Sequence, residues 1–99
     1  MVRFEWDERK RAANVAKHGL DLADAPRIFS GPVLEMDDER RDYRERRVVA
    51  LGVIAGRIVT CVYTDRTAPD ASTVRRVISL RIASREERAR YVAHTRTPP

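Results

Sequence analysis

Arginine side chains near the C-terminus are the groups in this sequence best suited to chemistry on an anion. The segment 74–91 reads VRRVISLRIASREERARY, in which an alternating, β-branched strand is followed after Ser84 by a helix. A guanidinium group is planar and can donate two parallel hydrogen bonds to a phosphate or a carboxylate. Arginines gathered at one point could therefore bind a phosphate, or stabilise the charge that develops when a ribose 2′-hydroxyl attacks it.

The spacing of these arginines indicates which of them could share one ligand. Because side chains alternate along a strand, Arg81 is expected on one face of the strand and Arg76 on the other. In the helix that follows, Arg85 and Arg88 are one turn apart and lie on the same side. We therefore predict that Arg81, Arg85 and Arg88 surround a single anion, with Tyr91 a further turn along.

The charge of the chain agrees with a polyanionic partner, but it also has a simpler explanation. The formal charge is +5 and the pI is near 10.1, and Lys10 and Lys17 are the only lysines. A basic domain favours nucleic acid because it neutralises phosphates. An arginine-rich genome would give the same bias with no function behind it. The arginines could also simply pair with Glu86, Glu87 and other carboxylates.

Other kinds of catalytic or binding site have no support in the sequence. It contains no glycine-rich phosphate loop, no G-x-S-x-G elbow and no H-E-x-x-H motif. His18 and His94 lie far apart, with no cluster of ligands beside either, so we expect no metal and no cofactor. Cys61 is the only cysteine and lies in an apolar run, where a thiol is buried and inert.

Length and hydropathy are typical of one globular domain. The 99 residues are enough for one modest core, and we treat residues 1–99 as a single domain. The N-terminus is charged and no long apolar segment follows it, so the sequence predicts neither a signal peptide nor a membrane-spanning helix. We expect the protein to stay in the cytoplasm.

A helix is predicted near the N-terminus. Asp7 is a good N-cap, and the helix that it starts should end at Gly19. Lys17 and His18 lie in its last turn, where the negative end of the helix dipole alone would favour positive charge. The side chains expected on its buried stripe are those of Ala12, Val15, Ala16 and Trp6.

A second, shorter helix is predicted over residues 20–30. Its apolar side chains recur at helical spacing, and Gly31-Pro32 should end it. Pro26 has no backbone N–H, so it fits best in the first turn, with Asp24 as the N-cap.

Strands are predicted from the middle of the chain onward. Residues 47–54 and 57–64 are rich in β-branched side chains and flank Ala55-Gly56, a typical two-residue hairpin turn. A polar loop over 66–73 then leads to the strand 74–83. Short turns between consecutive strands favour antiparallel pairing. Because 47–54 and 57–64 are apolar on both faces, the helices would cover one face, and a partner protein could cover the other.

The predicted fold class is α+β, with two N-terminal helices, an antiparallel sheet of three to four strands and a C-terminal helix. The fourth strand would be residues 33–36, followed by an exposed charge run over 37–46. The C-terminal helix spans 85–95 and begins with the capping box formed by Ser84 and Glu87.

Two separated blocks of residues carry a family resemblance. The first is FEWDxxKxxxNxxKHG at residues 4–19, and the last is RVISLRIA at 76–83, followed by Glu87, Arg88 and Tyr91. Arg47 and Gly52 lie between the blocks. With these residues in this order, the chain resembles the BrnT family of toxins from bacterial type II toxin–antitoxin systems. These are small ribonucleases with a fold related to RelE.

The resemblance implies an endoribonuclease that needs no metal and inhibits translation. It also implies a cognate antitoxin, a BrnA-like DNA-binding protein that neutralises the toxin in a hetero-oligomer. The residues implied to be catalytic are Arg81, His18, Tyr91 and Arg88, and those expected to bind RNA are Lys17, Arg76, Arg85 and Arg47. Arg81 and Arg88 would hold the scissile phosphate. His18 or Tyr91 would transfer the proton if the end of the first helix lies beside the last strand.

Some residues depart from the family pattern. Leu80 and Ile82 flank Arg81 where the family usually has alanine and lysine, and Pro26 replaces an ordinary helix former. The missing lysine removes one cation from the expected site. A non-catalytic nucleic-acid-binding module or a protein-interaction module therefore remains the alternative.

Overall fold

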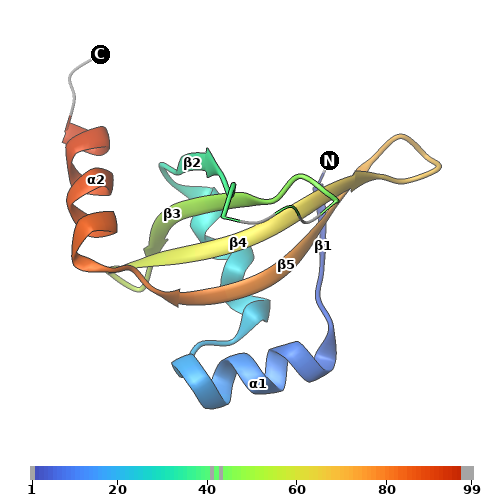
Figure 1. The fold of residues 1–99 in the computed structure, drawn as a ribbon, viewed down its shortest axis with the longest axis horizontal. Coiled ribbons are helices and arrows are strands. Elements are labelled where there is room, and N and C mark those ends of the chain that lie inside the picture. The colour runs from blue at the N-terminus through green and yellow to red at the C-terminus, as the bar shows by residue number, and fades with distance from the viewer. Residues whose placement is uncertain (1, 41, 43, 97–99) are drawn as a thin grey trace.

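A five-stranded mixed sheet forms the centre of the computed structural model, which describes residues 2–40, 42 and 44–96 (Figure 1). The order in the sheet is β1-β5-β4-β3-β2, and β2 to β5 form an antiparallel meander. The strands are β1 (Val2–Glu5), β2 (Leu34–Asp37), β3 (Val48–Ile54), β4 (Arg57–Thr67) and β5 (Thr73–Ile82).

The sheet corrects the predicted fold class in one respect. The α+β class and the antiparallel meander are confirmed, but β1 adds a further strand that pairs with β5 in parallel. Val2, Phe4 and Trp6 alternate with charged residues, which is typical of a short strand. The partner of this strand could not be predicted, because parallel pairing of Val2 with Thr73 joins segments far apart in the chain.

Ala55 and Gly56 form the predicted turn between β3 and β4. Their φ angles are 50° and 78°, so both residues are in the left-handed region that a type I′ hairpin turn needs. This turn fixes the register that pairs Ile54 with Arg57. Strand β4 runs on to Thr67, beyond the predicted end, because its last residues pair with the start of β5.

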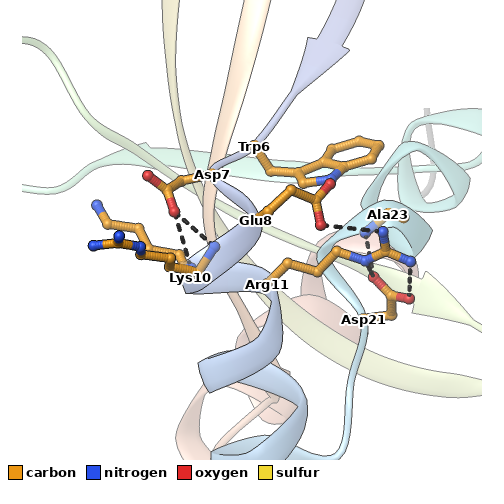
Figure 2. Close-up of polar contacts among 8 residues, drawn as sticks. Trp6, Asp7, Glu8, Lys10, Arg11, Asp21 and Ala23 are labelled. Atoms are coloured by element: carbon orange, nitrogen blue, oxygen red, sulfur yellow. Dashed lines mark hydrogen bonds and ion pairs between the residues drawn. The ribbon is translucent and has the colours of Figure 1, made fainter.

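Helix α1 (Glu8–His18) begins and ends as predicted. The Asp7 side chain accepts hydrogen bonds from the N–H groups of Arg9 and Lys10, and Gly19 ends the helix at φ 70°. Figure 2 shows this N-cap and, beside it, the Arg11 guanidinium, which donates two hydrogen bonds to the Asp21 carboxylate at 2.7 and 2.9 Å. The ion pair joins α1 to the segment that follows it.

The buried side of α1 differs from the predicted stripe. Trp6 is half-buried and packs against the core as predicted, but Ala12, Val15 and Ala16 are exposed, Val15 by 46%, and the buried residue of α1 is Asn14. The prediction was wrong for the three helix residues because α1 does not lie flat on the sheet. It lies beside β5, below the sheet in Figure 1, and contacts the strand through a polar side chain.

The second predicted helix is a 3₁₀ helix, η1 (Leu22–Ser30), with Pro26 inside it. Its N-cap is Asp21 and not Asp24, because the Asp21 side chain accepts from the Ala23 N–H at 2.9 Å. Leu22, Ala25 and Ile28 recur every three residues, which matches three residues per turn in a 3₁₀ helix. All three are buried in the core.

The core lies between η1 and one face of the sheet. Ile28 contacts β3 at Gly52, where a Cβ atom would lie only 2.8 Å from the Cβ of Ile28. Phe29 packs against Phe4 and Tyr63, with both ring-centroid distances at 5.7 Å. The buried cluster consists of Leu22, Ala25, Ile28, Val48, Ala50, Ile54, Val59, Cys61, Tyr63, Val77 and Leu80.

Helix α2 (Arg85–Arg96) covers part of the other face of the sheet. From the sequence, this face was expected to be available to a partner protein. Thr60 points away from the core residue Cys61 and donates to Glu87 of α2 at 3.0 Å. Tyr91 is buried and donates its hydroxyl to the carbonyl of Pro32 at 2.8 Å, whereas Ala89, two residues earlier, is exposed. In Figure 1, α1 lies beyond the β5 edge of the sheet, and α2 lies at the end of the sheet where β5 leads into it.

A β-bulge interrupts the alternation of β5. Val62 of β4 is opposite Ser79, but the next residue, Tyr63, is opposite Val77, so Ile78 has no partner. Because of this extra residue, the side chains of β5 that precede Ile78 project to the opposite face from the one that simple alternation predicts.

The bulge corrects the predicted faces of the arginines. Arg81 is opposite Thr60 and Arg76 is opposite Thr64, and these two threonines share a face of β4. Arg76 and Arg81 therefore lie on the same face, contrary to the prediction. Arg75 lies on the core face, where its guanidinium stacks 4.1 Å from the centre of the Tyr63 ring.

No helix in the part of the chain that the structure describes is long and apolar enough to cross a bilayer.

Candidate functional site

A cleft of about 630 Å³ lies on the sheet face that carries Arg81. Its walls come from the end of α1, the segment after β2 and the first turns of α2. The lining residues are Lys17, His18, Met36, Asp37, Asp38, Glu39, Arg40, Val49, Val62, Ser79, Arg81, Ser84, Glu86, Glu87 and Arg90.

The floor of the cleft is a row of side chains from four adjacent strands. Met36, Val49, Val62 and Ser79 are paired in register across β2, β3, β4 and β5. Residues paired in this way project to the same face of a sheet. The floor is therefore mostly apolar, and the charged groups stand around it.

Lys17 and His18 reach the cleft because Asn14 holds α1 against the edge of β5. The Asn14 amide donates to the carbonyl of Leu80 at 2.8 Å and accepts from the Leu80 N–H at 3.2 Å. One turn after Asn14, the last residues of α1 stand at the mouth of the cleft. The end of the first helix therefore lies beside the last strand, which is the arrangement that proton transfer by His18 would require.

Arg81 lines the cleft in an ion pair with Glu87. The two guanidinium nitrogens donate to the two carboxylate oxygens at 2.7 and 3.0 Å. The same carboxylate accepts from the hydroxyl of Thr60 at 3.0 Å and from the N–H of Ser84 at 2.8 Å, which completes the predicted capping box. Burial works against ionisation of Glu87, but these hydrogen bonds outweigh it and lower its pKa to about 2.

Carboxylates balance most of the cations in the cleft. Arg90 pairs with Glu86 at 3.0 Å, and Arg40 pairs with the buried Asp38 at 2.8 Å. Among the residues that the structure describes, Lys17 and His18 make no hydrogen bond or ion pair through their side chains. The predicted pairing of arginines with carboxylates is thus found, with Arg81 included.

Three of the predicted residues on α2 do not line this cleft. Arg85 is exposed, and Arg88 donates to the carbonyl of Ala83 at 3.2 Å. Tyr91 is buried with its hydroxyl on Pro32. Burial of Tyr91 sets the rotation of α2, and the predicted grouping of Arg81 with Arg85 and Arg88 around one anion does not form.

Arg76 and Arg47 form a second group on the same sheet face. Glu45 accepts from Arg76 at 3.1 Å and from Arg47 at 3.2 Å, so one carboxylate joins the two arginines. Glu45 belongs to the charge run predicted as an exposed loop, of which residues 41 and 43 lie outside the described residues. Along β5, Arg76 and Arg81 are roughly 15 Å apart at the usual rise of a strand.

Arg90 lines the cleft although the sequence argument gave it no role in the site. Glu86, Glu87 and Arg90 form one face of α2, because residues three and four apart are neighbours on a helix. Once Glu87 is paired with Arg81, this spacing brings Arg90 to the cleft. Arg40 and Met36 come from a distant segment, and no local pattern could have indicated them.

A second hollow, of about 560 Å³, lies on the opposite face of the sheet. Its charged groups are paired with each other: Arg75 with Asp65 at 2.8 Å, and Glu35 with the hydroxyl of Tyr63. Cys61, buried nearby, has its pKa raised to about 12 by burial. The charged groups of this hollow are therefore already engaged with one another.

A family comparison covers most of the chain. The model of the ribonuclease toxin BrnT, of type II toxin–antitoxin systems, matches residues 6–87. The match includes Lys17, His18 and Arg81, whereas Arg88 and Tyr91 lie beyond its end. No curated protein sequence matches the chain. Because the match covers most of the sequence, the chain belongs to the BrnT family of ribonuclease toxins of type II toxin–antitoxin systems.

Proposed function

We propose that this chain is an endoribonuclease that cleaves RNA in the Arg81 cleft without a metal ion and thereby inhibits translation. The observation that carries the proposal is the meeting of Lys17, His18 and Arg81 in one cleft, although they come from opposite ends of the chain. Two cations and an imidazole suit attack of a ribose 2′-hydroxyl on the neighbouring phosphate.

Each of these side chains has a proposed role in the reaction. The 2′-oxygen forms a bond to phosphorus while the bond to the 5′-oxygen breaks, which leaves a 2′,3′-cyclic phosphate. Arg81 and Lys17 stabilise the charge on the phosphate oxygens, and Arg90 supports them from α2. His18 moves the proton, from the 2′-hydroxyl or to the leaving 5′-oxygen. His18 is preferred to Tyr91, whose hydroxyl is already bonded to Pro32.

Arg76 and Arg47 are proposed to bind RNA outside the cleft. They share the sheet face of Arg81 and lie further along it. An RNA strand bound across this face would meet them on one side of the scissile phosphate. Arg85 and Arg88, which lie outside the cleft, would contribute only to the general attraction of the protein for RNA.

A cognate antitoxin is the proposed protein partner, since type II systems pair a toxin with a protein that neutralises it. We expect a BrnA-like, DNA-binding antitoxin that forms a hetero-oligomer with the toxin in the cytoplasm. The family resemblance also implies a fold related to RelE.

A non-catalytic nucleic-acid-binding module is the second candidate. It is favoured by the ion pairs that Arg81, Arg90 and Arg76 already form with carboxylates. In such a module the arginines would exchange these carboxylates for phosphates without any reaction.

Incubation of the purified chain with total bacterial RNA in EDTA separates the two candidates. We expect fragments that end in 2′,3′-cyclic phosphate, and we expect Arg81→Ala to abolish them and the arrest of growth on expression. Arg57→Ala, at the exposed start of β4 and outside the cleft, is the control that removes an arginine elsewhere. A folded Arg81→Ala protein that remains fully active would refute the role of Arg81. Binding of RNA without any cleavage would favour the second candidate.

A further inference from the structure

The carboxylate of Glu87 holds Arg81 by the end of its guanidinium group. Nη1 donates to Oε1 at 2.7 Å and Nη2 donates to Oε2 at 3.0 Å. Nη1 also donates to the carbonyl oxygen of Ile82 at 3.5 Å. A guanidinium has five N–H donors, so two remain, namely Nε–H and the second N–H of Nη2.

The two remaining donors form one edge of the guanidinium plane. They are parallel and have the spacing that binds two oxygens of a carboxylate or a phosphate. Within the described part of the chain, neither donor has a partner. The Arg81 side chain is 34% exposed and lines the cleft, so a ligand can reach this edge.

Glu87 is itself held from two sides, which makes it a rigid support. Thr60, on the central strand β4, has no exposed surface and donates to Oε1 at 3.0 Å. The N–H of Ser84 donates to the same oxygen at 2.8 Å, at the start of α2. The carboxylate therefore links the sheet, the helix and Arg81, and a swing of Arg81 would break contacts on all three.

We propose that Glu87 is a positioning residue for RNA cleavage. Its carboxylate accepts hydrogen bonds from Nη1 and Nη2 of Arg81 and so fixes the orientation of the guanidinium group. The free Nε/Nη2 edge then binds two oxygens of an RNA phosphate in the cleft. This inference rests on the proposed ribonuclease function, because it requires a phosphate at Arg81. Because Arg81 is oriented before the substrate binds, it loses little conformational entropy in the transition state. A freely rotating arginine would lose more.

Steady-state cleavage by Glu87→Gln tests the inference. The probe is a single-stranded RNA of mixed sequence that carries a fluorophore and a quencher. The amide keeps the shape of the side chain, but one of its two ends is a donor and opposes an Nη donor of Arg81. We expect kcat to fall about 10- to 100-fold, with KM changed less than about threefold. Glu8→Gln is the matched control, since it removes the same charge from an exposed residue outside the cleft, where the partner is Arg11.

A double-mutant cycle with Arg81→Lys shows whether Glu87 acts through Arg81. Lysine keeps the charge but has no two-donor edge to orient. In that background Glu87→Gln should cost less than about threefold, because the interaction is already lost. A merely structural role for Glu87 would give the same loss in both backgrounds.

A measurement on the unmodified chain keeps the inference testable if Glu87→Gln does not fold. The ¹⁵N-labelled Nε–H signal of Arg81 should shift when uncleavable 2′-O-methyl RNA is added, while the Nη signals stay in place. Displacement of the Nη signals would mean that RNA breaks the ion pair, and would overturn the inference.

The outcomes separate the two proposals. Full activity of Arg81→Lys, or no cleavage by the unmodified chain, would count against the proposed ribonuclease site. Loss of activity in Arg81→Lys with normal or increased activity in Glu87→Gln would overturn only the positioning role. Increased activity would identify Glu87 as a competitor of the phosphate.

Discussion

The side chain of Asn14 takes the place of a neighbouring strand for Leu80. Its amide donates to the Leu80 carbonyl at 2.8 Å and accepts from the Leu80 N–H at 3.2 Å, where β1 no longer covers the edge of β5. The same amide donates to the carbonyl of Leu20 at 2.8 Å, just after α1. One buried polar residue therefore fixes the position of α1 and, with it, Lys17 and His18.

Replacement of Asn14 by alanine should destabilise the protein by about 2–4 kcal/mol, because it leaves buried backbone groups of Leu80 without partners. Chemical denaturation measures the loss, and hydrogen exchange should show faster exchange of the Leu80 amide. Val15→Ala is the control from the adjacent position. Val15 is 46% exposed, and its replacement should change stability by less than about 0.5 kcal/mol. Equal losses from the two variants would contradict the arrangement described here.

Removal of the His18 imidazole should reduce RNA cleavage about 100-fold or more, while RNA binding stays within about threefold, because the proposed role is proton transfer. Cleavage rates and fluorescence anisotropy of an uncleavable RNA measure the two effects. The control is His94→Ala, on the exposed part of α2 away from the cleft. A His18→Ala protein with normal cleavage would exclude the histidine as the proton-transfer group.

Acid should remove stability that depends on Glu87. Its pKa is lowered from 4.5 to about 2 in the folded protein, so between these values the unfolded chain binds a proton that the folded chain does not. The contribution, up to about 3 kcal/mol, is complete above pH 4.5 and is lost as the pH falls toward 2. Unfolding free energies of the wild type and Glu87→Gln should therefore converge in acid. A difference that is constant with pH would show that Glu87 does not carry this ionisation.

Gly52→Ala should destabilise the fold by about 1–3 kcal/mol, because the new methyl group would meet Ile28 of η1 at 2.8 Å. Thermal unfolding measures the change. Gly31→Ala is the control. Gly31 is the C-cap of η1, and nothing lies within 4 Å of a Cβ atom added there. It should be neutral or slightly stabilising, since alanine restricts the unfolded chain. Tolerance of Gly52→Ala would mean that η1 is free to move away from β3.

Cys61 should resist alkylation in the native protein. The thiol has no exposed surface, and burial raises its pKa to about 12, so almost no thiolate is present at neutral pH. Labelling with iodoacetamide should follow global unfolding in a denaturant series. Cys61→Ala should keep the cleavage activity of the wild type. Fast labelling under native conditions, or loss of activity in a folded Cys61→Ala protein, would reopen a role for the thiol.

Local signals in the sequence determined the ends of the helices and the tight turn. Asp7 and Gly19 bound α1, the box of Ser84 and Glu87 starts α2, and Ala55-Gly56 turns the chain between β3 and β4. These features depend on hydrogen bonds and φ angles within a few residues, so the sequence is enough to predict them. The residues of the BrnT pattern also predicted the family, which the comparison confirmed.

Only the tertiary structure decided which side chains meet. The unpaired Ile78 moved Arg76 to the face of Arg81, and burial of Tyr91 turned Arg90 toward the cleft in place of Arg85 and Arg88. The parallel pairing of β1 and the bond of Asn14 to Leu80 join residues more than sixty positions apart. Periodicity along one segment carries no information about the register or rotation of another. Packing between distant segments fixes both, and with them the composition of the cleft.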